Sequence, residues 1–137
     1  MTVTVSVAAL ILRVVVGSIF IAEGSSKLWG FPKSPPARNL ARMIGSRRFP
    51  APALLATAVT VFEFGCGILL LTGTLTRLAA LPLIGIMAMA TFVFKRKDGF
   101  LGGWDWPFSV LGGTLAVFVL GAGAYSVDAA LQTPYMH

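Results

Sequence analysis

The sequence predicts an all-α integral membrane protein: one domain, residues 1–137, that forms a compact bundle of four transmembrane helices. The first observation behind this prediction is composition, because 56% of the residues are hydrophobic and only 12% are charged, against about 25% charged in an ordinary soluble domain. The second is size, since a soluble domain this small leaves much of its surface in water and this chain lacks the polar residues to cover it. The third is the presence of long apolar runs separated by proline, glycine and basic residues.

The lengths of these runs fit membrane-spanning helices. A hydrocarbon core of roughly 30 Å requires about 20 apolar residues in a helix, and backbone polar groups in lipid must pair within the segment. The expected spans are residues 5–28, 53–72, 75–94 and 106–121. The first is longer than the apolar region of a signal peptide, so we expect it to be retained.

Proline and glycine mark the connections between the spans. Pro35 lies beyond the first span and Pro52 begins the second, where a missing N–H costs least. Gly73 predicts a tight turn, and the third connection, residues 95–105, has the basic and glycine-rich composition of a loop. The fourth span should end near Gly121, after which Ser126 can cap a short terminal helical turn.

Residues 37–48, between the first two spans, can form a short amphipathic helix. Leu40, Met43 and Ile44 would share one face, with Arg38 and Arg42 on the other. We expect such a helix to lie in the membrane interface. An irregular basic loop is the alternative.

Basic residues near the ends of the spans predict the orientation. Two connections hold most of them: Lys33, Arg38, Arg42, Arg47, Arg48, Lys95, Arg96 and Lys97. The opposite side has little beyond Arg77, which we interpret as a basic loop residue. The positive-inside rule therefore predicts that both basic connections face the cytoplasm and both termini lie outside. Because the net charge of +6 is explained in this way, we expect lipid rather than nucleic acid as the partner.

Ionisable residues inside the expected spans are candidates for a functional site, because each is costly to place in lipid. Glu63 lies midway along the second span, and Arg13 in the first span is the natural cation to pair with it. We predict an intramembrane polar site formed by Arg13 and Glu63, which could serve chemistry or only fix packing. Glu23 and Lys27 are spaced i, i+4, which predicts an interfacial ion pair on one helix face.

The chain has few of the residues that bind metals or carry out thiol redox chemistry. His137 is the single histidine, and Cys66 is the single cysteine. A metal centre, a bis-histidine haem site or a redox pair of cysteines is therefore not expected from this chain alone. Whether the chain takes part in an enzyme stays open at this point, with no complete catalytic set to support activity by itself.

The order of several short motifs resembles the DoxX family of small bacterial membrane proteins. They are Leu12-Arg13, Phe20-Ile21, Gly24, Lys27-Leu28, Phe49-Pro50-Ala51-Pro52, Glu63 with Gly67, Leu71-Thr72-Gly73, Thr76-Arg77-Leu78-Ala79-Ala80, and Gly121 with Tyr125-Ser126-Val127-Asp128. The resemblance covers nearly the whole chain. It implies a four-helix protein of the bacterial inner membrane, in a family related to the membrane subunit of thiosulfate:quinone oxidoreductase, and it places Arg13, Lys27, Glu63 and Arg77 among recurring polar positions.

Two functions follow from the residues and this resemblance. The first is a scaffold or anchor subunit of a larger redox complex, next to a quinone, in which other membrane or redox subunits carry the metal or flavin. This chain would bind no cofactor alone, although a quinone or a lipid would suit its apolar surface. The alternative is a small proton-coupled transporter of the multidrug-resistance type, which would use a membrane-embedded glutamate such as Glu63.

Overall fold

The computed structural model describes residues 2–28 and 35–131, and this part of the chain contains helices and short connections with no β-strand. Four helical stretches are long and apolar enough to cross a membrane: Val3–Leu28, Pro52–Thr72, Thr76–Phe94 and Phe100–Leu120. The predicted all-α fold with four transmembrane helices is therefore confirmed. The first three stretches begin close to the predicted residues 5, 53 and 75, whereas the fourth begins at Phe100 rather than at residue 106.

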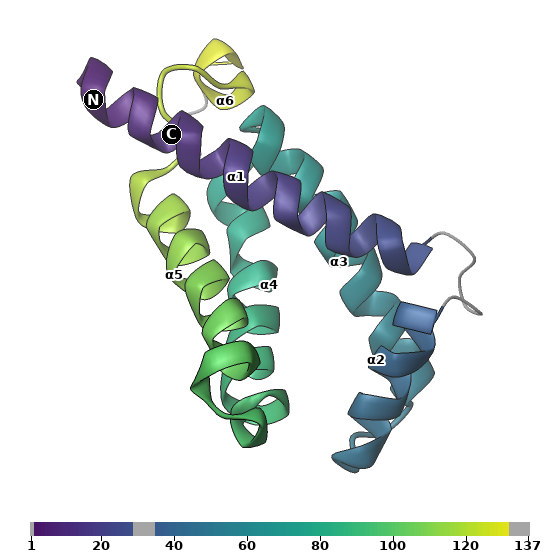
Figure 1. Ribbon diagram of the computed structural model, residues 1–137. Helices are drawn as coiled ribbons and strands as arrows, with labels where there is room; N and C mark the ends of the chain where they lie inside the picture. Colours follow the sequence, from purple (N-terminus) through teal and green to yellow (C-terminus); the bar gives the residue numbers. More distant parts are fainter. Residues whose placement is uncertain (1, 29–34, 132–137) are drawn as a thin grey trace.

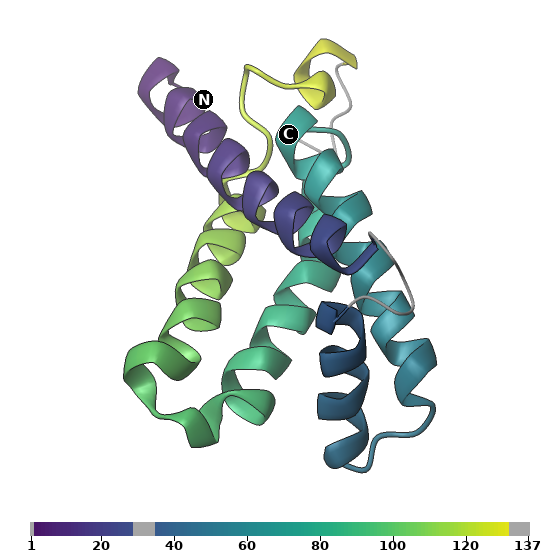
Figure 2. The ribbon, with the colours of Figure 1, turned by 45° about the vertical axis from the view of Figure 1, so that its right-hand side comes forward.

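The bundle is built from two helix pairs (Figures 1 and 2). Helix α1 (Val3–Leu28) packs most extensively against α3 (Pro52–Thr72), and α4 (Thr76–Met89) packs against α5 (Asp105–Leu120). Their shared core is largely apolar, and Phe20, Leu70, Leu83 and Val117 are fully buried in it. Toward one end of the molecule α4 and α5 separate from α3, as both views show.

Glycines fix how α1 and α3 lie against each other. A Cβ added to Gly24 would approach the Cβ of Phe64 to 2.7 Å, and one added to Gly17 would approach the carbonyl oxygen of Gly67 to 2.9 Å. Such distances leave no room for a side chain, so the two backbones meet closely at these points. The contact places Glu63 beside the last turns of α1.

The third connection is more helical than its composition predicts. A π-helical segment η1 (Ala90–Phe94) continues α4, a 3₁₀ turn η2 (Arg96–Asp98) follows, and a kinked π segment η3 (Phe100–Trp104) leads into α5. Gly99 and Gly102 have φ angles of +80° and +76°. The backbone leaves helical geometry at Gly99, Leu101 and Gly102, and the chain reverses there between helical segments.

Two short helices that the sequence predicts, one between the first two spans and one after the last span, are present in the structure. Helix α2 (Pro35–Ser46) replaces the predicted helix over residues 37–48, and its place in the membrane interface stays a prediction. Helix α6 (Val127–Leu131) begins after Ser126, whose Oγ accepts a hydrogen bond from the backbone N–H of Ala129 at 3.1 Å. Helix α2 lies at the end of the bundle where the helix pairs separate, and α6 lies at the other end (Figure 1).

Candidate functional site

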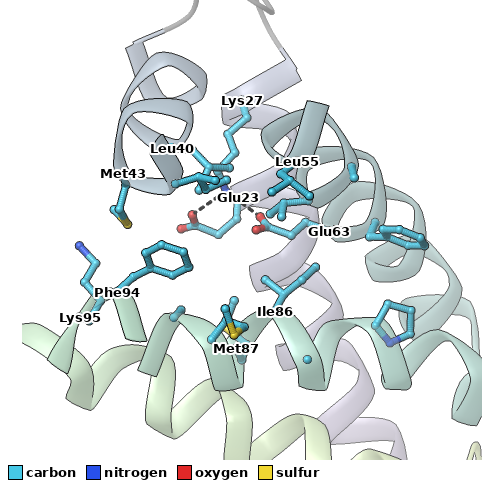
Figure 3. Close-up of a pocket in the computed structure, with 18 of the residues that line it drawn as sticks. Glu23, Lys27, Leu40, Met43, Leu55, Glu63, Ile86, Met87, Phe94 and Lys95 are labelled. Carbon is cyan, nitrogen blue, oxygen red and sulfur yellow. Dashed lines mark hydrogen bonds and ion pairs between the residues drawn. The ribbon is translucent and has the colours of Figure 1, made fainter. Parts of the chain in front are cut away.

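A cavity of about 640 Å³ lies between the separated helices. Its walls come from the end of α1, from α2, α3 and α4, and from η1, and most of its lining is apolar. The apolar face of α2 contributes Leu40, Met43 and Ile44, so this face turns toward the cavity. Figure 3 shows Leu40 and Met43 of α2 opposite the Phe94 ring of η1. Phe49, in the connection from α2 to α3, packs at a tilt against Phe94, with ring centroids 5.9 Å apart, and so connects the two sides of the cavity.

A cluster of three charged side chains interrupts the apolar lining, to which Asn39 and Lys95 also contribute polar groups. Lys27 Nζ lies 2.8 Å from Glu63 Oε2 and 3.7 Å from Glu23 Oε2, so one ammonium serves two carboxylates. The Glu63 side chain is 3% exposed and that of Lys27 11%, whereas that of Glu23 is 41% exposed. Figure 3 shows the Glu23 carboxylate and the Glu63 carboxylate on either side of the Lys27 ammonium. This is a buried ion pair with a third, more open charge at the cavity.

The predicted pair of Arg13 with Glu63 is wrong. Within the described part of the chain, the Arg13 guanidinium donates from Nη1 to the carbonyl oxygens of Leu70 and Leu71, at 3.3 and 3.2 Å, and from Nη2 to that of Tyr125. These acceptors include carbonyls at the C-terminal end of α3, where a helix dipole favours a cation. Arg13 therefore stabilises the end of the bundle away from the cavity.

The error has a geometric cause. Depth in the membrane suggested that Arg13 and Glu63 could meet, but the register set by Gly17, Gly24 and Gly67 brings α3 residues near 70 to the level of Arg13. Seven residues separate Glu63 from Leu70, which is about 10 Å along a helix. The glycines were the signal in the sequence that could have found the correct partner, Lys27.

Arg77 also has a structural place. It lies in the first turn of α4 rather than in a loop, and its Nε and Nη2 donate to the carbonyl oxygens of Phe118 and Val119 at 3.1 and 3.2 Å. These carbonyls belong to the last turn of α5, so Arg77 serves α5 as Arg13 serves α3. Of the four recurring polar positions, only Lys27 and Glu63 line the cavity.

Sequence reasoning missed a role for Asp128. Its buried carboxylate accepts hydrogen bonds from the backbone N–H groups of Leu75 and Thr76, at 2.8 and 3.1 Å, and from the Thr76 hydroxyl at 3.0 Å. It thereby caps the N-terminus of α4 from a helix more than 50 residues away in the chain. An acidic residue in the first turn of a short terminal helix gave no sign of this partner.

The cavity can bind an amphipathic molecule. Its apolar lining would take a hydrocarbon body, and the Glu23–Lys27–Glu63 cluster provides a charged point for a head group. Its volume lies within the roughly 300 to 1,000 Å³ of small-molecule sites. Pro82 and Gly85 lie in the α4 wall, and a Cβ added to Gly85 would meet no atom within 4 Å.

Four transmembrane helices around an apolar cavity with one ion cluster define a small multi-pass helical membrane protein. The chain belongs to the DoxX family, whose family model matches residues 8–96. It is similar to the uncharacterized membrane protein Rv3486 of Mycobacterium tuberculosis, with 33% identity that covers 88% of this chain and 79% of that protein. It is also similar to the inner membrane protein YqjF of Escherichia coli, with 28% identity over 92% of this chain and 93% of that protein. No solved structure matches the chain.

Proposed function

We propose that this protein is a scaffold subunit of a larger redox assembly in the bacterial inner membrane, and that it holds a quinone in the cavity. The observation that carries the proposal is the combination of a large apolar cavity with one acid–base cluster in its wall. A quinone has an apolar isoprenoid tail that matches the apolar lining. Its ring carries two carbonyl oxygen atoms that could meet the charged cluster. The relative YqjF is named as an inner membrane protein, which supports this location.

The chain's part in such an assembly is to bind and orient. The apolar side chains of α2, α3 and α4 would hold the tail, and the cluster around Lys27 would fix the ring at one end of the cavity. A partner subunit would supply the redox group that exchanges electrons with the quinone. Histidine and cysteine are the usual protein ligands of redox metal centres. This chain has one of each, His137 and Cys66, so a redox group held by a partner suits it.

Native purification in mild detergent tests the proposal. We expect quinone in the solvent extract of the purified protein, together with one or more partner subunits. Gly85→Phe should remove most of the quinone, because the new ring would occupy the cavity, whereas Gly112→Phe should retain it. Gly112 is the matched control: it is exposed, has no atom within 4 Å of an added Cβ and does not line the cavity. A clean homo-oligomer without quinone or partner would contradict the proposal.

One observation favours a second function, a small proton-coupled transporter. Two carboxylates, Glu23 and Glu63, share the ammonium of Lys27 beside the cavity. Excess negative charge in an apolar site is costly, so the cluster could exchange a proton for a lipophilic cation. Proteoliposomes with an imposed pH gradient should then accumulate tetraphenylphosphonium, and Glu63→Gln should abolish the accumulation. Accumulation that persists in Glu63→Gln would remove this mechanism.

A further inference from the structure

The balance of hydrogen-bond donors and acceptors in the polar cluster bears on which head group the cavity accepts. Two ionised carboxylates present four oxygen atoms that only accept, and one ammonium presents three N–H groups that only donate. The ammonium of Lys27 lies between both carboxylates, with Glu63 at 2.8 Å and Glu23 at 3.7 Å. The ammonium of Lys27 is therefore engaged by both carboxylates, and their four acceptor oxygens outnumber the donors that it directs at them.

Glu23 is the member of the cluster that a ligand meets most readily. Its side chain is 41% exposed, and its contact with Lys27 is the longer of the two. Figure 3 shows its carboxylate directed into the cavity, below the Lys27 ammonium and level with Glu63. The polar end of the cavity thus presents a carboxylate, which is an acceptor, to an entering head group.

A second ammonium lines the cavity on another side. Figure 3 shows Lys95 beside Phe94, across the cavity from Lys27 and Glu63. Its Nζ lies 4.0 Å from Asp98 Oδ2, and its side chain is 42% exposed. Lys95 therefore has its own carboxylate near the end of the bundle and does not reverse the acceptor excess around Glu23.

We infer that the cavity selects head groups that donate hydrogen bonds, so that among quinones it binds the reduced hydroquinone more tightly than the oxidised form. This inference rests on the proposed function and adds a redox-state preference to it. The hydroxyl groups of a hydroquinone can donate to the carboxylates of Glu23 and Glu63, and hydrogen bonds to charged acceptors are the stronger kind. The carbonyl oxygens of the oxidised quinone only accept, so they meet these carboxylates without a proton between them.

Calorimetric titration of the purified protein in detergent, under argon, tests the inference. The probes are decylubiquinone and decylubiquinol, which share one tail. They differ in redox state: two ring oxygens are carbonyls in the quinone and hydroxyl groups in the quinol. We expect the Kd for the quinol to be lower by about tenfold or more, the factor that one hydrogen bond to a charged group provides. Gly85→Phe sets the background from partition into detergent micelles, because its cavity is filled.

Two variants test whether the Glu23 carboxylate causes the preference for the quinol. Glu23→Gln removes one acceptor charge and adds an N–H donor at nearly constant shape, so the Kd ratio should fall to within about threefold. Asp105→Asn is the matched control, since Asp105 bonds to the backbone of Trp106 and does not line the cavity. Its Kd ratio should equal that of the unaltered protein.

The outcomes separate the inference from the proposed function. Equal binding of the two forms, or tighter binding of the quinone, would overturn the inference and leave the quinone site standing. Binding of neither form above the Gly85→Phe background would overturn both. A quinol preference that survives Glu23→Gln in a folded protein would show that the carboxylate is not its source, and would also overturn the inference.

Discussion

At the scale of single residues, the buried carboxylate of Glu63 depends on the ammonium of Lys27. Moving an ion from water into a protein interior costs several kcal/mol, and a close partner repays this cost only while it is present. Lys27 lies 2.8 Å from Glu63 and supplies that partner. Glu23, at 3.7 Å from the same ammonium and much more exposed, contributes less.

Removal of the lysine should therefore destabilise the protein strongly. We expect Lys27→Met to lower the free energy of unfolding by about 3 to 5 kcal/mol, because Glu63 is left without its cation. Lys27→Met combined with Glu63→Leu should recover most of that loss, since neither charge then remains buried. Reversible unfolding by sodium dodecyl sulfate in mixed micelles would measure these differences.

Arg13 provides the comparison. It shares no partner with Glu63, so the losses from Arg13→Met and Glu63→Leu should add within about 0.5 kcal/mol in the double variant. Strong recovery in that double variant, in place of recovery in the Lys27 and Glu63 double variant, would contradict the observed pairing.

Single charged residues show what the sequence could predict about the site and what it could not. An ionisable residue in an apolar run stands out by its cost, and Glu63 was found in this way. Its partner depends on how two helices are offset along their axes, which charge cost does not determine. Only the close approaches at Gly17, Gly24 and Gly67 fix that offset. For the same reason, no pattern in the sequence indicates that Asp128 caps α4.

At the scale of elements, the turn between α3 and α4 is contacted by α1 and by the chain around the start of α6. Gly73 ends α3 with φ +76°, and its carbonyl accepts a hydrogen bond from the N–H of Asp128 at 2.9 Å. A Cβ at Gly73 would approach Ser126 to 2.5 Å and Arg13 Nη1 to 2.6 Å. The turn was predictable from its glycine, but its use as the docking point for α1 and α6 was not.

A methyl group at this turn tests how tightly the elements are joined. Gly73→Ala should cost more than about 1 kcal/mol, because it combines a left-handed backbone with steric overlap. Gly112→Ala should be neutral or slightly stabilising, since Gly112 is inside α5 with open space around its Cα. Melting temperatures in the same detergent would compare the two variants. A Gly73→Ala protein as stable as Gly112→Ala would show that α6 does not dock as described.

Helix α2 marks the limit of prediction from amphipathic patterns. The alternation of apolar and basic residues correctly predicted a helix. A hydrophobic face can be covered by lipid or by protein, and the pattern is the same in both cases. In the structure Leu40, Met43 and Ile44 line the cavity, so part of the face expected to meet lipid belongs to the candidate site.

At the scale of the whole molecule, the two ends of the bundle differ in chemistry. The end with α2 and the η segments (Figure 1) carries the connection that holds Lys95, Arg96 and Lys97. The cavity lies near this end. At the other end, Arg13 and Arg77 direct their charges at backbone carbonyls, and α6 docks on the turn at Gly73. Basic side chains near solvent are thus concentrated at the cavity end.

This asymmetry predicts the orientation in the membrane. Basic residues next to membrane spans are retained in the cytoplasm, so the cavity end should face the cytoplasm and α6 the outside. The sequence alone makes this prediction, and its assignment of His137 to the outside falls beyond the described residues. In this fold the Glu23–Lys27–Glu63 cluster would then lie in the cytoplasmic half of the bundle. A proton-coupled transporter would therefore exchange protons at this cluster with the cytoplasm.

Cysteine labelling tests the orientation, because the single native cysteine, Cys66, is buried and can be replaced by serine. In that background we would place one new cysteine at Arg96 or at Leu131, both exposed and at opposite ends. A membrane-impermeant maleimide added to intact bacteria, after the outer membrane is permeabilised, should label Leu131→Cys. It should label Arg96→Cys only once the inner membrane is also disrupted. The reverse pattern would place the cavity toward the outside, and proton supply from the cytoplasm would then have to cross the α6 end of the bundle.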